Sequence, residues 1–221
     1  PTPEAFLKEF EAARDAGDEM VCVLLSSALS GTYQSAAIAR EEADYDGIYL
    51  VDSKNVTLAA QLLVRRAGDL ARSGMSAAEI AEDLEKARER VHLFALVDTL
   101  KYLHKGGRLS GAAAIAGGLL GIKPVIGINA EGKLALTDKA RGLPGAYVAI
   151  FKQIGKVGGI DERYPVMLGY TGRRAAVEPF IRYITQNLHL NKPVLRIIGS
   201  VVGTHAGPGA CGIAFFSKEE E

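Results

Sequence analysis

Residues 26–36 read Ser-Ser-Ala-Leu-Ser-Gly-Thr-Tyr-Gln-Ser-Ala, and this stretch decides the fold of the first part of the chain. It follows the apolar run 20–25, which predicts a buried strand, and it precedes a segment that predicts a helix. A strand that breaks at small residues and restarts as a helix leaves backbone N–H groups free at the helix N-terminus, where they favour an anion. Ser30 and Thr32 would add hydroxyl donors, and Gly31 lacks the Cβ that would keep a ligand away. The competing interpretation is that Ser30 or Thr32 only caps the helix.

The composition limits the classes of function. A chain of 221 residues with 48% apolar residues can build one large domain or two small ones. Lys and Arg number 26, as do Asp and Glu, so the balanced charge argues against a nucleic-acid-binding surface. Cys22 lies in the first apolar run and Cys211 in a Gly-rich tail, which suggests a reducing compartment, the cytoplasm. Neither Cys has a paired ligand spacing, so we expect no metal site.

No segment predicts a signal peptide or a membrane span. The opening Pro-Thr-Pro-Glu lacks a charged segment followed by an apolar one. The longest uncharged run, 197–217, is interrupted by glycines, by His205 and by Pro208. This run predicts a strand, a turn and a strand.

The first 90 residues alternate helices and strands. Apolar periodicity predicts helices at 3–16, up to about 43 and at 58–71, and strands at 20–25 and 47–52. Ser76 and Glu79 have the spacing of a capping box, which predicts the start of a further helix. Such alternation is typical of a parallel α/β layer.

The second part of the chain has a different pattern. We predict strands at 91–97, 165–170, 193–200 and 212–216 and a hairpin of 125–128 with 133–137. We also predict helices that begin near Asp98 and Pro144, and a helix that carries apolar residues at helical spacing from Val177 to Leu188. The helix from Pro144 is expected to bury Phe151. A hairpin mixed with helices favours an α+β domain with a largely antiparallel sheet. We therefore expect a domain boundary near Arg90.

Three side chains in predicted loops are candidates for chemistry. His205 lies in a Gly/Pro turn after a strand, where loops often present functional groups, although a lone loop His is commonly just solvated. Arg108 and Arg141 lie in tight loops, where the guanidinium group of arginine can bind a phosphate or carboxylate through two parallel N–H groups. Helix capping and surface solvation are the alternatives for the two arginines.

Four blocks of the sequence together resemble the DegV family of bacterial fatty-acid-binding proteins. The first block is 26–36, and the second is Tyr-Leu-His-Lys-Gly-Gly-Arg-Leu-Ser at 102–110. The third runs from Gly-Ile-Lys-Pro-Val-Ile at 121–126, through an acidic-Gly turn, to Lys-Ala-Arg-Gly at 139–142. The fourth is His-Ala-Gly-Pro-Gly-Ala-Cys-Gly at 205–212. They occur in the family's order and spacing across nearly the whole chain.

The resemblance implies a two-domain α/β fold, with an N-terminal parallel α/β layer at 1–90 and a C-terminal α+β domain at 91–221. It implies a carrier and not an enzyme. The carrier would bind one long-chain fatty acid such as palmitate, with no other cofactor and with the tail buried between the domains. In the better-studied branch of the family, the carrier presents the carboxyl group to a separate fatty acid kinase, which makes an acyl phosphate.

The resemblance also implies roles for single residues. The carboxylate would be bound at Ser30, Gly31 and Thr32 and by the imidazole of His205 on the opposite side. Arg108 and Arg141 would lie near the carboxyl end and face the kinase or the phosphate.

A small, apolar segment at 112–121 could form either a packed core helix or the wall of an apolar pocket. Burial of an acyl tail contributes about 0.8 kcal/mol per CH₂, so a tail pocket would dominate the affinity. We expect the small side chains of this segment to leave room for the tail, through Ala114, Gly117, Gly118 and Leu119.

The sequence departs from the family pattern at its start. Family members usually begin with a further α/β stretch that contains a first strand and, later, a Thr-Ser-x-Pro segment whose Thr also binds the carboxylate. This sequence starts at the Pro-Thr-Pro-Glu that follows such a Thr. The family's first strand and one ligand-binding hydroxyl are therefore absent from this sequence: either a piece is missing from the chain as given, or the site is incomplete.

Two other classes of function stay open. Ser30 and His205 could be the nucleophile and base of a hydrolase, although the chain lacks a Gly-x-Ser-x-Gly elbow. The Ser/Gly bend could instead bind a small anion or phosphate, although no Walker or Gly-x-Gly-x-x-Gly motif is present.

Overall fold

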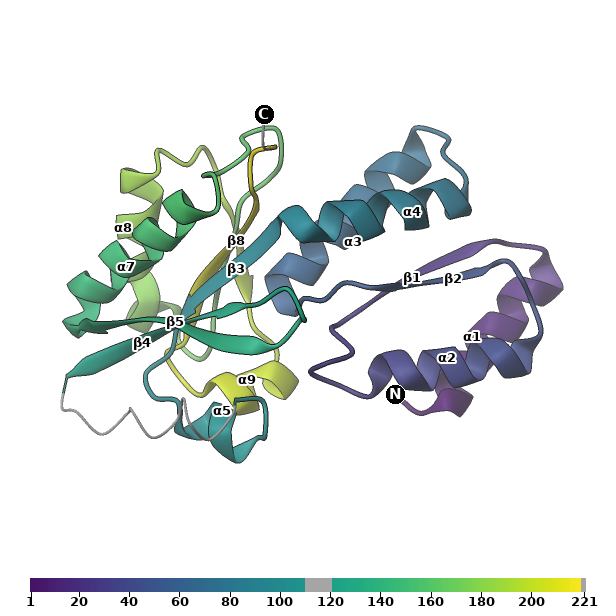
Figure 1. The fold of residues 1–221 in the computed structure, drawn as a ribbon, viewed down its shortest axis with the longest axis horizontal. Coiled ribbons are helices and arrows are strands. Elements are labelled where there is room, and N and C mark those ends of the chain that lie inside the picture. Colours follow the sequence, from purple (N-terminus) through teal and green to yellow (C-terminus); the bar gives the residue numbers. More distant parts are fainter. Residues whose placement is uncertain (110–120, 220–221) are drawn as a thin grey trace. The chain divides into compact units, whose positions relative to one another are not determined.

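The computed structural model describes residues 1–109 and 121–219, and its contacts divide the chain into two compact units (Figure 1). The first unit comprises residues 1–56, 60–89 and 130–132. The second comprises residues 57–59, 90–129 and 133–221.

The first unit is built on two parallel strands. Its elements are α1 (Pro3–Ala16), β1 (Met20–Leu24), α2 (Thr32–Ala43), β2 (Ile48–Asp52), α3 (Thr57–Arg72), α4 (Ala77–Ala87) and η1 (Arg88–Arg90). The register of β1 on β2 runs from Met20 opposite Ile48 to Leu24 opposite Asp52. The predicted parallel α/β layer is confirmed.

Local sequence signals set the helix ends of this unit. The Thr2 hydroxyl accepts a hydrogen bond from the backbone N–H of Ala5 at the start of α1, and Gly17 ends that helix with a φ of 72°. The predicted capping box at Ser76 and Glu79 is present at the start of α4. Three fully buried alanines of α2, Ala36, Ala39 and Ala43, form one core cluster with residues of α1.

The second unit is a mixed six-stranded sheet with helices. Its elements are β3 (Val91–Leu96), α5 (Lys101–Lys105), β4 (Ile122–Ile128), β5 (Leu134–Arg141), α7 (Gly142–Lys156), β6 (Met167–Tyr170), α8 (Arg174–Asn187), β7 (Val194–Ile197), α9 (Ser200–Ala206) and β8 (Cys211–Phe216). The strand order is β5-β4-β3-β8-β6-β7, and β6 with β7 is the parallel pair. This confirms the prediction of a mixed, largely antiparallel sheet.

Strand β8 lies inside this sheet and every residue of it is buried. Ile213 and Phe215 face a cluster built with α7 and α8, which includes Ile150 and Phe180. Ala210, just before β8, belongs to a smaller cluster with Leu103 of α5, against which Ala206 of α9 packs. Helices α5 and α9 lie together at the lower edge of the unit in Figure 1.

Several details differ from the sequence predictions. A helix, α9, lies between the last two strands, where the sequence predicts a turn. The strand predicted at 212–216 begins one residue earlier, at Cys211. Phe151 of α7, expected to be buried, is 43% exposed. The helix expected from Asp98 begins at Lys101.

A buried carboxylate joins the two ends of the second unit. Asp161 accepts hydrogen bonds from Nη2 of Arg90 at 2.7 Å and from Nη2 of Arg163 at 2.7 Å. Arg90 also donates from Nε to the backbone carbonyl of Ser217, just past β8. The hydrogen bond from Arg163 is the main cause that lowers the pKa of Asp161 to about 2.

We predict that Asp161→Asn lowers the free energy of unfolding at pH 7 by about 1–3 kcal/mol, because a hydrogen-bonded charge is lost. The folded-state pKa lies below the unfolded one. The contribution of Asp161 is therefore present above about pH 4 and is lost as the pH falls toward 2. Urea denaturation followed by circular dichroism at several pH values tests this. Glu162→Gln, at the exposed neighbouring carboxylate, is the control. If Asp161→Asn leaves the protein as stable as the parent at pH 7, the prediction is contradicted.

Candidate functional site

The bend between β1 and α2 is built around Ser26, whose side chain is fully buried. The Ser26 N–H donates to the carbonyl of Asn55 at 2.8 Å. Its own carbonyl accepts from the N–H groups of Leu29 and Ser30, which turns the chain toward α2. The Ser26 hydroxyl donates to the carbonyl of Gly132 at 2.8 Å. A Cβ on Gly132 would overlap that hydroxyl oxygen, so the position requires glycine.

Ser30 and Thr32 lie together at the N-terminus of α2. Their hydroxyl oxygens are 2.9 Å apart, and either can be the donor. The Thr32 N–H donates to the Ser30 oxygen at 3.3 Å. A pair of hydroxyls that share one hydrogen bond retains a second O–H, which can be donated to an anion at the helix N-terminus.

Gly31 is the N-cap of α2 and, because it is glycine, offers no side chain to accept a hydrogen bond from the N–H groups at the helix end. The residue is exposed, and a Cβ built on it meets no atom within 4 Å. The expected open approach at Gly31 is therefore present on the surface of the first unit. Helix capping explains only one of the two hydrogen bonds here. The Ser30 hydroxyl oxygen accepts from the Thr32 N–H, as a cap would, but it also shares a hydrogen bond with the Thr32 hydroxyl.

A carboxylate that sequence reasoning missed lies beside the same bend. Asp52, the last residue of β2, accepts from the Ser27 hydroxyl at 2.6 Å and from the Lys54 N–H at 2.9 Å. The Asp-Ser pair at a strand end is a turn signal that could have indicated it. Asp52 thus engages the Ser27 hydroxyl, while Ser30 and Thr32 bond to each other.

His205 lies in the last turn of α9, so its prediction as a turn residue is wrong. Its Nδ1 is buried and has no hydrogen-bond partner among the residues that the structure describes. The loop after it is held by Thr171, whose buried hydroxyl donates to the carbonyl of Gly207 at 2.6 Å and accepts from the Ala210 N–H at 2.9 Å. The helix ends here because Gly207 adopts a φ of 79°.

The two candidate arginines both belong to the second unit. Arg108 is exposed after α5 and donates from Nη1 to the carbonyl of Gly106 at 2.7 Å. Arg141 is exposed at the junction of β5 and α7. Ser30, Gly31 and Thr32 belong to the first unit, and His205 belongs to the second with the arginines.

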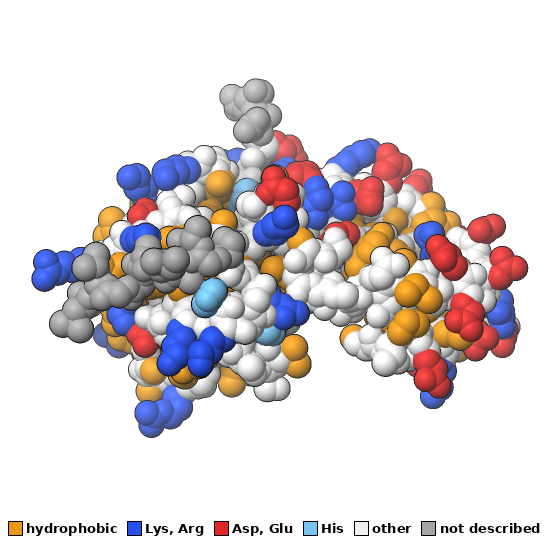
Figure 2. All heavy atoms as spheres, turned by 60° about the horizontal axis from the view of Figure 1, so that its bottom comes forward, with side chains coloured by type: hydrophobic (Ala, Val, Ile, Leu, Met, Phe, Trp, Pro, Cys, Tyr) orange, Lys and Arg blue, Asp and Glu red, His pale blue; other side chains and the backbone are white. Residues whose placement is uncertain are grey.

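The charges divide unequally between the units. The first unit has nine Lys and Arg against eighteen Asp and Glu, whereas the second has seventeen against eight. Figure 2 shows acidic side chains gathered on the first unit and clusters of basic side chains on the second. The zero net charge of the chain therefore hides a basic second unit.

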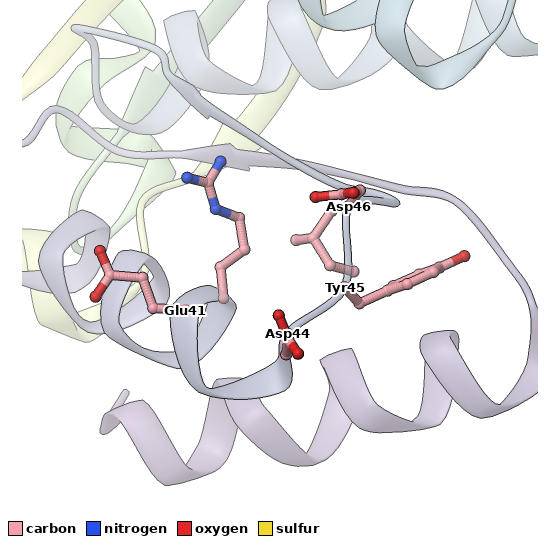
Figure 3. A pocket seen from close by; sticks show the side chains of 6 residues that line it. Glu41, Asp44, Tyr45 and Asp46 are labelled. Carbon is pink, nitrogen blue, oxygen red and sulfur yellow. The ribbon is translucent and has the colours of Figure 1, made fainter.

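The predicted tail-pocket residues Ala114, Gly117, Gly118 and Leu119 lie outside the described residues. One described pocket, of about 290 Å³, lies in the first unit beyond the end of α2 (Figure 3). Charged side chains line it, among them Glu41, Asp44 and Asp46. Burying hydrocarbon there would desolvate charges without compensation, so this pocket does not suit an acyl tail.

Within residues 1–109 and 121–219, no group of three or more His, Cys, Asp or Glu side chains is placed to bind a metal ion. In the same ranges, every helix is too short or too polar to span a bilayer.

Comparison with known proteins gives a match over nearly the whole chain. A family model described as "Uncharacterised protein, DegV family" matches residues 1–218. A DegV domain-containing protein of Caldanaerobacter subterraneus is 33% identical over 217 residues, which are 98% of this chain and 77% of that protein.

Two solved structures share the fold. One is described as fatty acid binding by a DegV family protein from Thermus thermophilus. It has 29% identity and a TM-score of 0.85, and the match covers 99% of this chain and 78% of that one. The other is a stearic acid-binding protein from Eubacterium ventriosum. It has 26% identity and a TM-score of 0.85, and the match covers 99% of this chain and 77% of that one.

We predict that Ser26→Ala lowers the free energy of unfolding by about 1–3 kcal/mol, because the buried carbonyl of Gly132 loses its donor. Ser27→Ala is the matched control at the exposed neighbouring serine, because its partner Asp52 is partly exposed and can bond to water instead. Urea denaturation of both variants measures the difference. Equal losses for the two would contradict the assignment of Ser26 as the residue that holds the bend.

Proposed function

Because this chain belongs to the DegV family, we propose that it carries one long-chain fatty acid whose carboxylate is bound by Ser30, Thr32 and His205. The observation that carries the proposal is the hydroxyl pair at the N-terminus of α2. It stands in a chain whose fold matches proteins described as fatty-acid-binding. A carboxylate in an apolar site needs such donors, because without them it becomes protonated.

In this proposal the chain acts as two domains, 1–90 and 91–221, with the tail buried between them. The first domain supplies Ser30 and Thr32, and Gly31 leaves room for the carboxylate. The second supplies His205, whose half-buried imidazole has an enclosed Nδ1 and can donate one hydrogen bond. The tail-pocket assignment to Ala114, Gly117, Gly118 and Leu119 stays a prediction.

We propose a cytoplasmic carrier, not an enzyme. Cys22 and Cys211 are both free, and burial raises their pKa to about 11 and about 12. The thiols therefore stay protonated at neutral pH and are poor nucleophiles. The Ser30 hydroxyl pairs with the Thr32 hydroxyl, whereas the serine of a hydrolase pairs with a general base such as His.

The first test compares ligands with the same tail. Palmitate and 1-hexadecanol bury equal hydrocarbon, so the ratio of their affinities reports the head group. We predict that the double variant Ser30→Ala, Thr32→Ala lowers palmitate affinity about 10- to 100-fold, because hydrogen bonds to a charged group are lost. Hexadecanol affinity stays within about twofold.

Displacement of a fluorescent fatty acid measures both affinities, and native mass spectrometry measures the stoichiometry. Ser27→Ala is the control, because Asp52 engages its hydroxyl. An unchanged ratio in the double variant would overturn the proposed carboxylate site. Labelling of Ser30 by a fluorophosphonate would favour a hydrolase instead, and stabilisation by phosphate but not by palmitate would favour a phosphate-binding protein.

We further propose that the carrier presents the carboxyl group to a separate fatty acid kinase. The excess of basic residues on the second unit supports docking to an acidic surface. Arg108 and Arg141 are exposed and can face the kinase or the phosphate.

We predict that Arg108→Glu and Arg141→Glu each lower the rate of acyl phosphate formation by a bacterial fatty acid kinase about tenfold, through repulsion in the docked complex. Palmitate affinity stays unchanged. Arg182→Glu, an exposed residue of α8, is the control with the same change of charge. Rates equal to that control would exclude the two arginines from docking.

A further inference from the structure

Helices α5 and α9 interlock through two glycines at their C-terminal ends. A Cβ on Gly106, which ends α5, would overlap Nδ1 of His205 on α9 and lie 2.9 Å from Cε1 of the same ring. A Cβ on Gly207, which ends α9, would overlap Cδ2 of Tyr102 on α5 and lie 2.8 Å from its Cε2. Each helix thus places a ring against the terminal glycine of the other.

Position 106 needs a glycine because a side chain there would overlap the imidazole, and not because its backbone conformation is one that only glycine adopts. Its φ of −77° and ψ of −3° are helical values that any residue adopts. The next residue shows the opposite case, because Gly107 has a φ of 71° and a Cβ on it would meet no atom within 4 Å. The two neighbouring glycines therefore have separable functions.

The backbones on both sides of this contact are held in place. Thr171 bonds the carbonyl of Gly207 and the N–H of Ala210, both as buried hydrogen bonds. Leu103 of α5 is 2% exposed in a cluster against which Ala206 packs. A methyl group added at Gly106 would consequently displace the imidazole in preference to either helix.

Nothing else in the described residues orients the His205 ring through Nδ1. That atom is buried and has no hydrogen-bond partner among them. The fit against Gly106 therefore sets the rotation of the ring. With Nδ1 enclosed, Nε2 is the nitrogen left to donate to a ligand.

We propose that Gly106 is a positioning residue for His205: the space left by its missing side chain holds the imidazole in the orientation that offers Nε2–H to the fatty-acid carboxylate. The inference rests on the proposed function, because it takes His205 as a carboxylate ligand. It assigns to the first glycine of the Lys-Gly-Gly-Arg segment a role in head-group recognition.

The test is a double-mutant cycle of Gly106→Ala with His205→Ala, read by the affinities for palmitate and 1-hexadecanol. We expect each single variant to lower palmitate affinity about tenfold and to leave hexadecanol affinity unchanged. In the His205→Ala background, Gly106→Ala has no further effect, because the residue acts only through the ring. Gly107→Ala is the control, which lowers stability through its strained φ but keeps the palmitate to hexadecanol ratio.

The outcomes separate this inference from the proposed function. If His205→Ala leaves the ratio unchanged, the role of His205 is wrong and both proposals for it fail. If His205→Ala changes the ratio and Gly106→Ala does not, the inference alone is wrong. It is also overturned if Gly106→Ala lowers the ratio further in the His205→Ala background.

A second measurement needs no variant at Gly106. Long-range ¹H–¹⁵N correlation spectra of the parent protein with bound palmitate report which ring nitrogen of His205 carries the proton. His205→Ala assigns the signals. We expect the Nε2–H tautomer and a nuclear Overhauser contact between the ring and the Gly106 Hα protons. A neutral Nδ1–H tautomer would overturn the inference.

Discussion

The rest of the first unit depends on one requirement: the polar groups of the bend after β1 must be satisfied although Ser26 is buried. Its N–H, carbonyl and hydroxyl all have partners, and these partners come from three different segments of the chain. Because these bonds fix where the strand stops and how the chain turns, they also fix where α2 begins. The N-terminus of α2 then presents the hydroxyls of Ser30 and Thr32 side by side.

The second unit follows a comparable logic around β8. A strand buried along its whole length needs neighbours on both edges, which β3 and β6 supply. Helices α7 and α8 cover the face of β8 that carries Ile213 and Phe215. The segment that leads into β8 is thereby held closely, and it carries His205 a few residues earlier. The position of the imidazole thus follows from packing in the core. Thr171 holds the backbone of Gly207 next to it, and α5 contacts the ring at Gly106.

Charge has a different role from the hydrogen bonds. Zero net charge excludes a broadly basic protein, but it conceals an acidic first unit and a basic second one. Such an asymmetry affects the rate and orientation of encounter with charged partners more than it affects the fold. The proposed fatty-acid site and the proposed docking of a kinase therefore depend on separate properties of the chain. The first uses hydroxyl and imidazole donors, and the second uses surface charge.

The sequence alone determined the features that short-range physics controls. Strand β1, the start of α2, the capping box of α4 and the β4–β5 hairpin follow from periodicity, caps and turn residues a few positions apart. Four spaced blocks also indicated the DegV family, which the family comparison confirmed. The tertiary structure alone decided that β8 lies inside the sheet, that a helix carries His205, that Ser26 bonds to Gly132 and that Gly106 receives an imidazole. The Ser26–Gly132 and Gly106–His205 contacts join segments about a hundred residues apart, and no local propensity of the chain encodes such a meeting.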